Sequence, residues 1–304
     1  MTQDTPSRCS ICNGTDIQEY GDEWKLQRCK RCGHTKGISG LEKLQAAEEN
    51  FFGDDQYILF RSKNKSYFES LAAKRAADLR NHISGLQDKS LLDIGCSLGE
   101  FLNAVSKDCR SVKGQDTAAG VIEYAKGAYD VEIHDALTEI VPEQFDVVTA
   151  FHVIEHVDDP HNFIEHIKGF IKPGGWINIR TPNVGSLSGR LSGKNWPGIS
   201  IEHTHLFTPK SLETLLQKSG FTQIKVLTKS HARFPVGALQ RYLKGGNKID
   251  GDSGAGGNRN SGSTRLKIMS ILDLPYAPIA LLEGWMRAGD EVVVFAKKTD
   301  ASVS

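Results

Sequence analysis

Short apolar segments alternate with amphipathic segments from about residue 89 onward. The apolar segments have the length of buried strands, and the amphipathic ones repeat their apolar positions every three or four residues, as helices do. An α/β fold is therefore predicted, with a doubly wound, mostly parallel sheet that binds ligands at the carboxyl ends of its strands. We expect strands at 90–94, 111–115, 131–134, 145–151, 176–180, 222–227 and 291–296, and helices at 101–107, 118–126, 162–171 and 209–219.

Three stretches fall outside this alternation. Residues 1–40 are poor in aliphatic side chains and rich in Cys, Gly and polar residues, which predicts a small unit that needs a staple to fold. Residues 41–85 predict helices, because apolar side chains recur every three or four positions between 67 and 83. Residues 245–264 are rich in Gly, Ser and Asn and predict a flexible surface insertion. We therefore expect an N-terminal unit at 1–40, a helical lid or linker at 41–85 and the α/β domain at 86–304.

The N-terminal unit contains four of the six cysteines, in two Cys-x-x-Cys pairs separated by 16 residues. Two such pairs can close a tetrahedral site of four thiolates, which is the geometry of structural zinc. With all four positions filled, no open position remains for catalysis. Alternatives are that His34 replaces one cysteine as a ligand, or that the pairs are redox-active or unrelated. The sequence thus predicts a zinc ribbon held by Cys9, Cys12, Cys29 and Cys32, which chelation should unfold while the α/β domain stays folded.

Composition limits the partners. Lys plus Arg and Asp plus Glu both number 37, so the formal net charge is zero and a broad electrostatic surface for nucleic acid is not expected. The N-terminus lacks the apolar stretch of a secretory signal. Residues 271–286 form the longest apolar run, but Asp273 and Glu283 interrupt it, so no membrane span is expected. A cytoplasmic protein is predicted, and the sequence gives no oligomeric state.

A glycine turn follows the first strand of the α/β domain. Asp93 lies near the end of the strand, Gly95 and Gly99 follow, and a helix comes next. Glycine lets a backbone approach a ligand where a side chain would clash. The dinucleotide pattern Gly-x-Gly-x-x-Gly is not met, and taken alone the two glycines could be turn formers and Asp93 a turn-capping residue.

Acidic residues end the next two strands. Asp116 follows the second strand about 20 residues after the glycine turn, where a carboxylate can accept hydrogen bonds from both hydroxyls of a ribose. Asp135 follows the third strand, where a carboxylate could meet an adenine amino group. The fourth strand then ends at Phe151, and His152 begins a polar loop beside the same edge.

This ordered series resembles class I S-adenosylmethionine-dependent methyltransferases, in the group that includes the ubiquinone O-methyltransferases and sugar and natural-product methyltransferases. The segments LDIGCSLG at 92–99 and FDVVTAFHVIEHVDDP at 145–160 carry the resemblance, with Asp116 between them. It extends over about 86–228 and the final strand. Ser97 stands where the family usually has glycine, which could stiffen the turn. The resemblance implies a Rossmann-like fold, S-adenosylmethionine as cofactor, and a cofactor site formed by Asp93, Gly95, Cys96, Gly99, Asp116, Asp135, Phe151 and His152.

The expected acceptor is a small molecule. The cofactor supplies an activated methyl group, and the protein must align the acceptor and remove a proton where the acceptor is a hydroxyl. Histidine is the usual base near neutral pH. The resemblance places a Glu-His pair, Glu202 and His203, after the fifth strand, and His156 follows the fourth. We predict catalytic roles for these three, although each histidine could instead be structural, and Trp196 could wall the acceptor pocket.

The leading prediction is thus O-methylation of a sugar, a glycan precursor or a natural product, with C-methylation left open. An RNA methyltransferase that grips RNA with its zinc ribbon is the alternative, supported by Arg28, Lys30, Arg31 and Lys36 and opposed by the neutral net charge. A non-enzymatic scaffold that keeps the fold is a third possibility, and Ser97 is its only support.

Overall fold

The computed structural model describes residues 8–20, 26–37, 55–193, 196–200, 202–230, 278 and 280–299. Its strands are β1 (Ile17–Tyr20), β2 (Leu26–Cys29), β3 (Thr35–Lys36), β4 (Ser90–Ile94), β5 (Ser111–Gln115), β6 (Glu132–His134), β7 (Phe145–Phe151), β8 (Ile171–Pro182), β9 (His205–Leu206), β10 (Phe221–Lys229) and β11 (Glu291–Lys298). Its helices are α2 (Asp55–Lys63), α3 (Lys65–His82), α4 (Glu100–Val105), α5 (Ala119–Ala128), α6 (Pro160–Lys168), α7 (Leu187–Ser192) and α8 (Pro209–Lys218), with short 3-10 turns η1 (Leu86–Asp88) and η2 (Leu137–Glu139).

The larger sheet has seven strands in the order β10-β11-β8-β7-β4-β5-β6. Its strands run parallel except β11, which is antiparallel to both neighbours. Along the sequence, β4 is the first strand of this sheet. β5 and β6 follow on one side of β4, and β7 and β8 then follow on its other side. The carboxyl ends of β4 and β7 therefore meet at the centre of one edge, where doubly wound sheets bind ligands. The predicted doubly wound sheet is confirmed.

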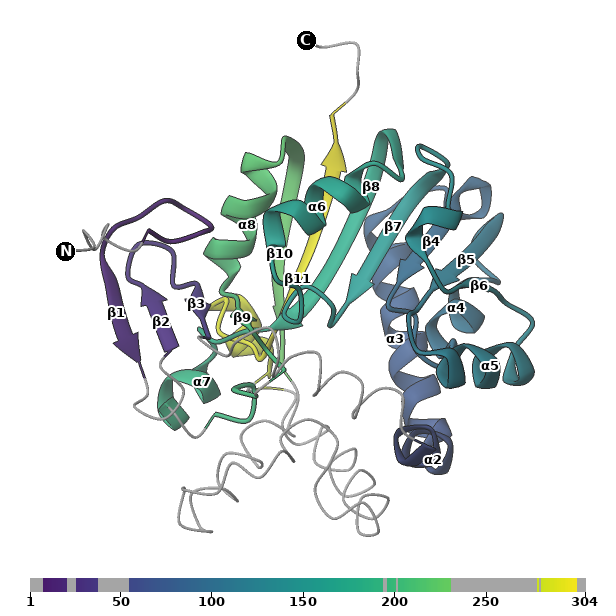
Figure 1. The fold of residues 1–304 in the computed structure, drawn as a ribbon, viewed down its shortest axis with the longest axis horizontal. Helices are drawn as coiled ribbons and strands as arrows, with labels where there is room; N and C mark the ends of the chain where they lie inside the picture. Colours follow the sequence, from purple (N-terminus) through teal and green to yellow (C-terminus); the bar gives the residue numbers. More distant parts are fainter. Residues whose placement is uncertain are drawn as a thin grey trace, which may run out of the picture.

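Alternation along each strand divides the core into two layers. On β11, Val292 and Val294 pack in the cluster that contains α6 and α8, whereas Val293 and Phe295 pack in the cluster that contains α3, α4 and α5. Successive side chains of a strand point to opposite faces, so an unbroken apolar strand needs helices on both. Figure 1 shows α6 and α8 on one side of the sheet and α3 on the other.

The predicted boundary between helix and strand near residue 170 is wrong. The helix expected at 162–171 begins at Pro160, capped by the Asp159 side chain, and ends at Lys168. Ile171 instead starts β8 and pairs with Phe145 of β7. The pairing register then shifts before Trp176, because the Pro-Gly-Gly sequence in between forms an irregularity in the strand. An apolar residue that continues helical spacing can equally begin a strand, which is why the pattern misplaced this end.

The four cysteines lie in a second, smaller sheet of order β1-β2-β3-β9, in which every pair is antiparallel. Its fourth strand comes from the α/β part of the chain, because β9 lies between α7 and α8. In Figure 1 this sheet stands beside α8 and α7. Thus the N-terminal unit is completed by a strand from the part of the chain that forms the large sheet.

The division at residues 40 and 85 stays a proposal, and α2 and α3 supply the helices expected within 41–85. The predicted insertion at 245–264 lies outside the described residues, as do residues 41–54. No helix in the described part of the chain has both the length and the apolar character needed to cross a membrane.

Candidate functional site

Backbone hydrogen bonds hold the glycine turn after β4 against the end of β5. The backbone N–H groups of Gly95 and Cys96 both donate to the carbonyl of Gln115, at 2.8 and 3.0 Å. Gly95 and Gly99 have φ of +69° and +81°, and a Cβ on Gly95 would lie 2.5 Å from a methyl group of Val153. Glycine is therefore required at Gly95 for both its backbone angle and its surroundings. The turn brings β4 and the loop after β7 into contact.

Asp116 supports this turn from the end of β5. Its Oδ2 accepts the N–H of Ser97 at 2.8 Å, and its Oδ1 accepts the N–H of Ala118 at 3.1 Å. Burial raises the pKa of Asp116, and these backbone donors act against that rise. A carboxylate has about four lone-pair sites, so two remain for a ligand. Ser97 has φ +50°, so the turn keeps a left-handed residue where the family usually has glycine.

Asp93 and Cys96 lie deeper than the turn itself. Asp93 is 3% exposed and accepts a hydrogen bond from the hydroxyl of Thr149 on β7. Burial raises the pKa of Asp93 to about 7, although Thr149 and the charge of Arg75 act in the opposite direction. Burial also raises the pKa of the Cys96 thiol, which makes Cys96 a small apolar side chain rather than a reactive one. Both side chains therefore support the turn from the interior of the protein.

The remaining predicted cofactor residues line the same edge. Asp135 is exposed beyond β6, and its carbonyl accepts a hydrogen bond from Gln115 at 3.3 Å. Phe151, at the end of β7, packs edge-on against Phe101 with ring centroids 4.8 Å apart. The guanidinium of Arg75, on α3, lies 5.1 Å from the centre of the Phe151 ring.

His152 has both ring nitrogens against carboxylates. Its Nδ1 lies 3.2 Å from Glu155 and its Nε2 lies 2.9 Å from Glu291, at the start of β11. Carboxylate oxygens only accept hydrogen bonds, so both nitrogens donate and the ring is an imidazolium. Burial would lower the pKa of His152, but the two carboxylates outweigh it and raise the pKa. Arg180 donates to Glu291 at 3.2 Å, which extends this buried charge network.

Several further groups at this edge were not among the predicted site residues. Tyr57, on α2, places its hydroxyl 2.8 Å from the Ser97 hydroxyl, and Arg61 on the same helix donates to Glu100 at 2.8 Å. Helix α2 therefore contacts the glycine turn and the start of α4 directly. Arg75 and Glu291 also escaped prediction, because an ion pair between residues 216 positions apart leaves no trace in a local pattern.

Glu155, His156 and His203 meet on the other side of the loop after β7. One ligand atom from each lies within 4.8 Å of the other two. The rings of His156 and His203 are 4.8 Å apart at an interplanar angle of 72°. Two histidines that were predicted from separate motifs, 47 positions apart, are thus brought together with a carboxylate. Such a group can accept a proton or hold a divalent cation.

Hydrogen bonding fixes the protonation of both histidines. His156 Nδ1 lies 3.1 Å from the Glu202 carbonyl, and His203 Nδ1 lies 2.8 Å from the Gly198 carbonyl. Carbonyls only accept, so each Nδ1 carries a hydrogen and each neutral ring leaves a lone pair on Nε2. Burial lowers the pKa of His156 to about 4 and also lowers that of His203. Both rings are therefore neutral at pH 7 and able to accept a proton.

Glu155 stays ionised beside them. Burial opposes its ionisation, but the hydrogen bond and charge of His152 outweigh burial and lower the pKa of Glu155 to about 2. Glu202 is 7% exposed, and the described contact that connects it to the group is made by its carbonyl. Trp196 is fully buried in an apolar cluster with Leu26 of β2. It is a core residue packed with residues of the smaller sheet, not the exposed wall of an acceptor pocket.

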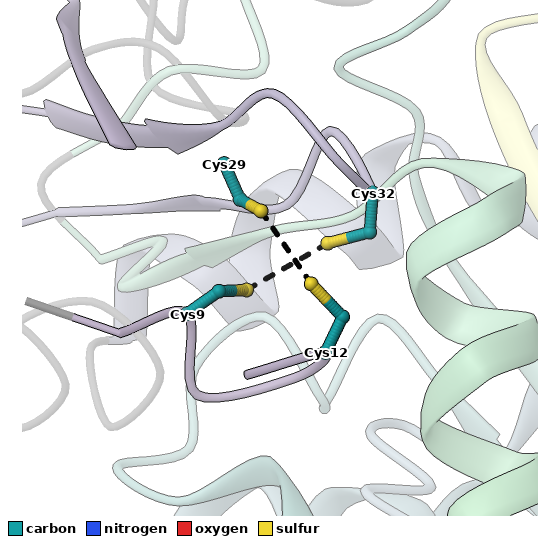
Figure 2. A group of neighbouring side chains, drawn as sticks. All are labelled: Cys9, Cys12, Cys29 and Cys32. Carbon is teal, nitrogen blue, oxygen red and sulfur yellow. Dashed lines mark hydrogen bonds between the residues drawn. The ribbon is translucent and has the colours of Figure 1, made fainter. Parts of the chain in front are cut away.

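The four predicted cysteines form a compact buried group (Figure 2). Cys9 Sγ lies 3.6 Å from Cys32 Sγ, and Cys12 Sγ lies 3.5 Å from Cys29 Sγ. These separations are far longer than the ~2.05 Å of a disulfide. A tetrahedral zinc with Zn–S bonds of about 2.3 Å requires sulfurs roughly 3.8 Å apart. The two measured separations are within a few tenths of an ångström of this value, and all four sulfurs lie within 4.8 Å of one another.

The two cysteine turns have the same backbone. In the first, Asn13 N–H donates to the Cys9 carbonyl at 2.9 Å; in the second, Gly33 N–H donates to the Cys29 carbonyl at 2.8 Å. Asn13 and Gly33 both have positive φ, 62° and 78°. His34 Nδ1 lies 4.0 Å from Cys9 Sγ, but the group of ligand atoms that all lie within 4.8 Å of one another consists of the four sulfurs. The geometry thus matches the predicted four-cysteine set.

Curated relatives match the central part of the chain. The ubiquinone biosynthesis O-methyltransferase of Paracidovorax citrulli is 32% identical over 111 residues, which is 33% of this chain and 47% of the relative. The protein of the same name from Pseudomonas entomophila is 36% identical over 107 residues, which is 32% of this chain and 46% of the relative. The chain therefore spans about half the length of the curated relatives it matches.

Solved structures share the fold at low identity. A SAM-dependent methyltransferase from Thermotoga maritima has a TM-score of 0.52 at 18% identity, with 84% of this chain and 100% of that chain covered. The phosphoethanolamine N-methyltransferase 2 of Haemonchus contortus, in complex with S-adenosyl-L-methionine, has a TM-score of 0.51 at 17% identity, with 88% of this chain and 62% of that chain covered. Both support the Rossmann-like methyltransferase fold.

The sequence profile of the family described as methyltransferase domain matches residues 67–226, slightly more than half of the chain. This range includes the glycine turn, Asp116 and the loop that carries Glu155 and His156. The resemblance inferred from the motifs is thereby confirmed. The chain belongs to the methyltransferase domain family and has the Rossmann-like methyltransferase fold.

Proposed function

We propose that this protein transfers the methyl group of S-adenosylmethionine to a hydroxyl oxygen of a small molecule. One observation carries the choice of oxygen: His156 and His203 each donate from Nδ1 to a backbone carbonyl and have lowered pKa values, so both rings are neutral imidazoles beside an ionised Glu155. A hydroxyl must lose its proton during methyl transfer, and a neutral imidazole is suited to accept it. We assign the role of base to His203, with His156 as the second candidate.

The cofactor site follows from the edge at which β4, β5 and β7 end. We propose that Gly95 and Gly99 let the backbone approach the cofactor and that Asp116 binds the ribose hydroxyls with its two remaining lone pairs. Asp135 would meet the adenine amino group, and Phe151 and His152 would flank the cofactor. Asp93 and Cys96 support the turn from below, and Glu202 positions His156 through its carbonyl.

The chemistry is divided between cofactor and protein. S-adenosylmethionine supplies an activated methyl group on its sulfonium. The protein aligns the acceptor oxygen with the methyl group, and Nε2 of the histidine base accepts the hydroxyl proton. Glu155 then stabilises the imidazolium that forms, because its lowered pKa keeps it negative. The relatives, named ubiquinone biosynthesis O-methyltransferases, also support oxygen as the acceptor atom.

The acceptor class remains the one that the motifs suggested: a sugar, a glycan precursor or a natural product. An RNA acceptor is the alternative to exclude. One of its supporting residues, Lys30, lies 3.5 Å from Asp16, so part of its charge is neutralised within the ribbon. Retention of the protein on RNA at low salt, weakening steeply as salt rises, would favour the alternative.

We also propose that Cys9, Cys12, Cys29 and Cys32 hold a structural zinc ion. The sulfur separations and the paired backbone turns support this ion and this number of ligands. Four protein ligands leave no open coordination position, so the ion would have a structural role. Six cysteines without a disulfide are consistent with a reducing, cytoplasmic environment, which we keep as part of the proposal.

An acceptor screen tests the proposal. The protein is incubated with S-adenosylmethionine and catechols, nucleotide sugars or polyphenols, and S-adenosylhomocysteine is quantified. We expect turnover of a hydroxyl acceptor that falls by about 100-fold or more in His203→Asn, the scale of a lost general base. His166→Asn, on the exposed face of α6, is the control and should match the wild type. Methylation of nitrogen or carbon, or full activity in both His203→Asn and His156→Asn, would contradict the proposal.

A further inference from the structure

A short strand joins the zinc ribbon to the proposed acceptor site. β9 begins two residues after His203 and forms the fourth strand of the ribbon sheet, where His205 pairs with Lys36 and Leu206 pairs with Thr35. The Gly37 N–H also donates to the Thr204 carbonyl at 2.9 Å. The ribbon therefore contacts the chain immediately next to one of the two candidate bases.

The same short segment is bonded on its other side to the loop after β7. The His205 N–H donates to the Glu155 carbonyl at 3.1 Å. The Thr204 hydroxyl lies 3.2 Å from that carbonyl and 3.0 Å from the carbonyl of Val157, and so donates to this loop as well. Thr204 and His205 thus form a bridge with the ribbon on one side and the backbone of Glu155 on the other.

Side chains make a second, parallel connection. His205 Nε2 lies 3.1 Å from the Asp158 carbonyl and therefore donates to it. His205 Nδ1 lies 3.0 Å from His34 Nε2, and the two rings stack with centroids 5.2 Å apart. His34 itself follows Cys32 by two positions and packs beside Cys9. A continuous path thus runs from the cysteine group through two histidines to the loop after β7.

This contact is part of the interior. His34 is 2% exposed and His205 is 1% exposed, and the four cysteines share an apolar cluster with α6 and α8. The Thr208 hydroxyl, at the start of α8, donates to the Cys32 carbonyl at 2.7 Å. A Cβ on Gly33 would lie 2.7 Å from a methyl group of Thr208, so the two parts approach as closely as a glycine permits. An appendage on a flexible connection would not be buried in this way.

We propose that the four-cysteine ribbon is a positioning element of the acceptor site: it holds Thr204 and His205, and through them sets the relative positions of His203 and the Glu155–His156 loop. The identity of the acceptor site rests on the proposed function, whereas the mechanical connection does not. The metal would then affect the acceptor site as well as the stability of the ribbon. Loss of the metal should loosen one edge of the methyltransferase site and leave the cofactor edge, at β4 and β5, in place.

Hydrogen exchange on the full chain tests this without an acceptor. Exchange is followed by mass spectrometry in the zinc-loaded protein and after chelation, and S-adenosylmethionine affinity is measured in both. We expect amides in 155–158 and 204–206 to exchange about thirtyfold faster after chelation, the factor that two lost hydrogen bonds contribute to local opening. Exchange in 90–94 and cofactor affinity should change by less than about threefold.

Two variants and a matched control separate the bridge from general loss of structure. His205→Asn and His34→Asn each interrupt the histidine path and should accelerate exchange in 155–158 while the zinc stays bound. His161→Asn removes another contact with the ribbon, the 2.9 Å hydrogen bond to the Ser10 carbonyl, but from α6 rather than from the loop. It should leave exchange in 155–158 unchanged.

Three results would overturn the inference. Unchanged exchange in 155–158 and 204–206 after chelation would mean that the ribbon is a separate appendage. Loss of cofactor binding together with global unfolding would mean that it supports the whole fold rather than one edge. Equal effects of His161→Asn and His205→Asn would remove the role of the histidine path. A failed acceptor screen with accelerated exchange would instead reject the proposed function and leave this connection standing.

Discussion

Replacement of Asp116 gives the sharpest test of the cofactor site. Its carboxylate already accepts two backbone N–H groups, from Ser97 and Ala118, and offers the two remaining lone pairs to the ribose hydroxyls. Asp116→Ala removes all four acceptors and leaves the N–H of Ser97 without its partner. Asp116→Asn keeps the size and one acceptor oxygen, but it removes the charge and turns an N–H₂ group toward a backbone donor.

The magnitude follows from the bonds lost. A hydrogen bond to a charged group contributes about 1.5–3 kcal/mol. Loss of two ribose bonds in Asp116→Ala therefore costs about 3–6 kcal/mol of binding free energy, or roughly a 100- to 10,000-fold rise in Kd. Asp116→Asn loses one of these bonds together with the charge, so about 2 kcal/mol and roughly a thirtyfold rise in Kd are expected.

Calorimetric titration with S-adenosylmethionine measures these Kd values. Asp130→Ala, an exposed acidic residue beyond α5, is the matched control and should bind like the wild type. Thermal unfolding in the absence of cofactor shows whether each variant is folded. If Asp116→Asn and Asp116→Ala are folded and bind within about twofold of the wild type, Asp116 does not contact the ribose and the assignment of this edge is wrong.

Three further predictions address the glycine turn and the proposed acceptor site. Tyr57→Phe and Ser97→Gly each remove the 2.8 Å hydrogen bond that joins α2 to the glycine turn, so each should speed cofactor dissociation by about fivefold, and the double variant should add nothing further in stopped-flow measurements. Gly95→Ala requires φ +69° and places its Cβ 2.5 Å from Val153, so urea unfolding should show about 2–4 kcal/mol less stability, and a loss below about 0.5 kcal/mol would contradict the packing. Because burial lowers the pKa of both candidate bases, His203 and His156, below the ordinary imidazole value, both rings stay neutral near pH 7, and the methyl-transfer rate should be flat between about pH 7 and 8. A decline that begins at or above about pH 7 would indicate a base with an ordinary imidazole pKa instead.

The regular part of the fold was predictable because its signals are local. The strands β4, β5 and β7 have the predicted bounds. Of these, β4 and β7 are mostly apolar runs that end at a glycine and at a polar loop. Asp116 was predictable for a related reason: the end of a parallel strand lies at the ligand edge whatever surrounds it. The paired cysteines likewise carry their geometry in their spacing.

The connections between these parts were not predictable. β9 has two residues, too few to show any periodicity, and its partner β3 lies about 170 positions away. The His34–His205 contact and the Arg75–Glu291 pair span 171 and 216 positions and follow from tertiary packing alone. The local pattern also could not separate His203, at the proposed site, from His205, in the bridge to the ribbon, because the two differ only in the partners that folding provides.

The pairing of β9 with the ribbon sheet also constrains the order of folding. The two cysteine turns close over short loops and can form around a metal ion early, because short loops cost little entropy to close. The edge of β3 then stays unpaired until the chain up to β9 has been made and the large sheet has formed. Contacts of such long sequence separation form slowly, and an unpaired edge is prone to aggregate in the interval. With the proposed zinc bound, the protein should therefore pass through a metal-bound but incomplete ribbon, whose lifetime is set by the folding of the large sheet.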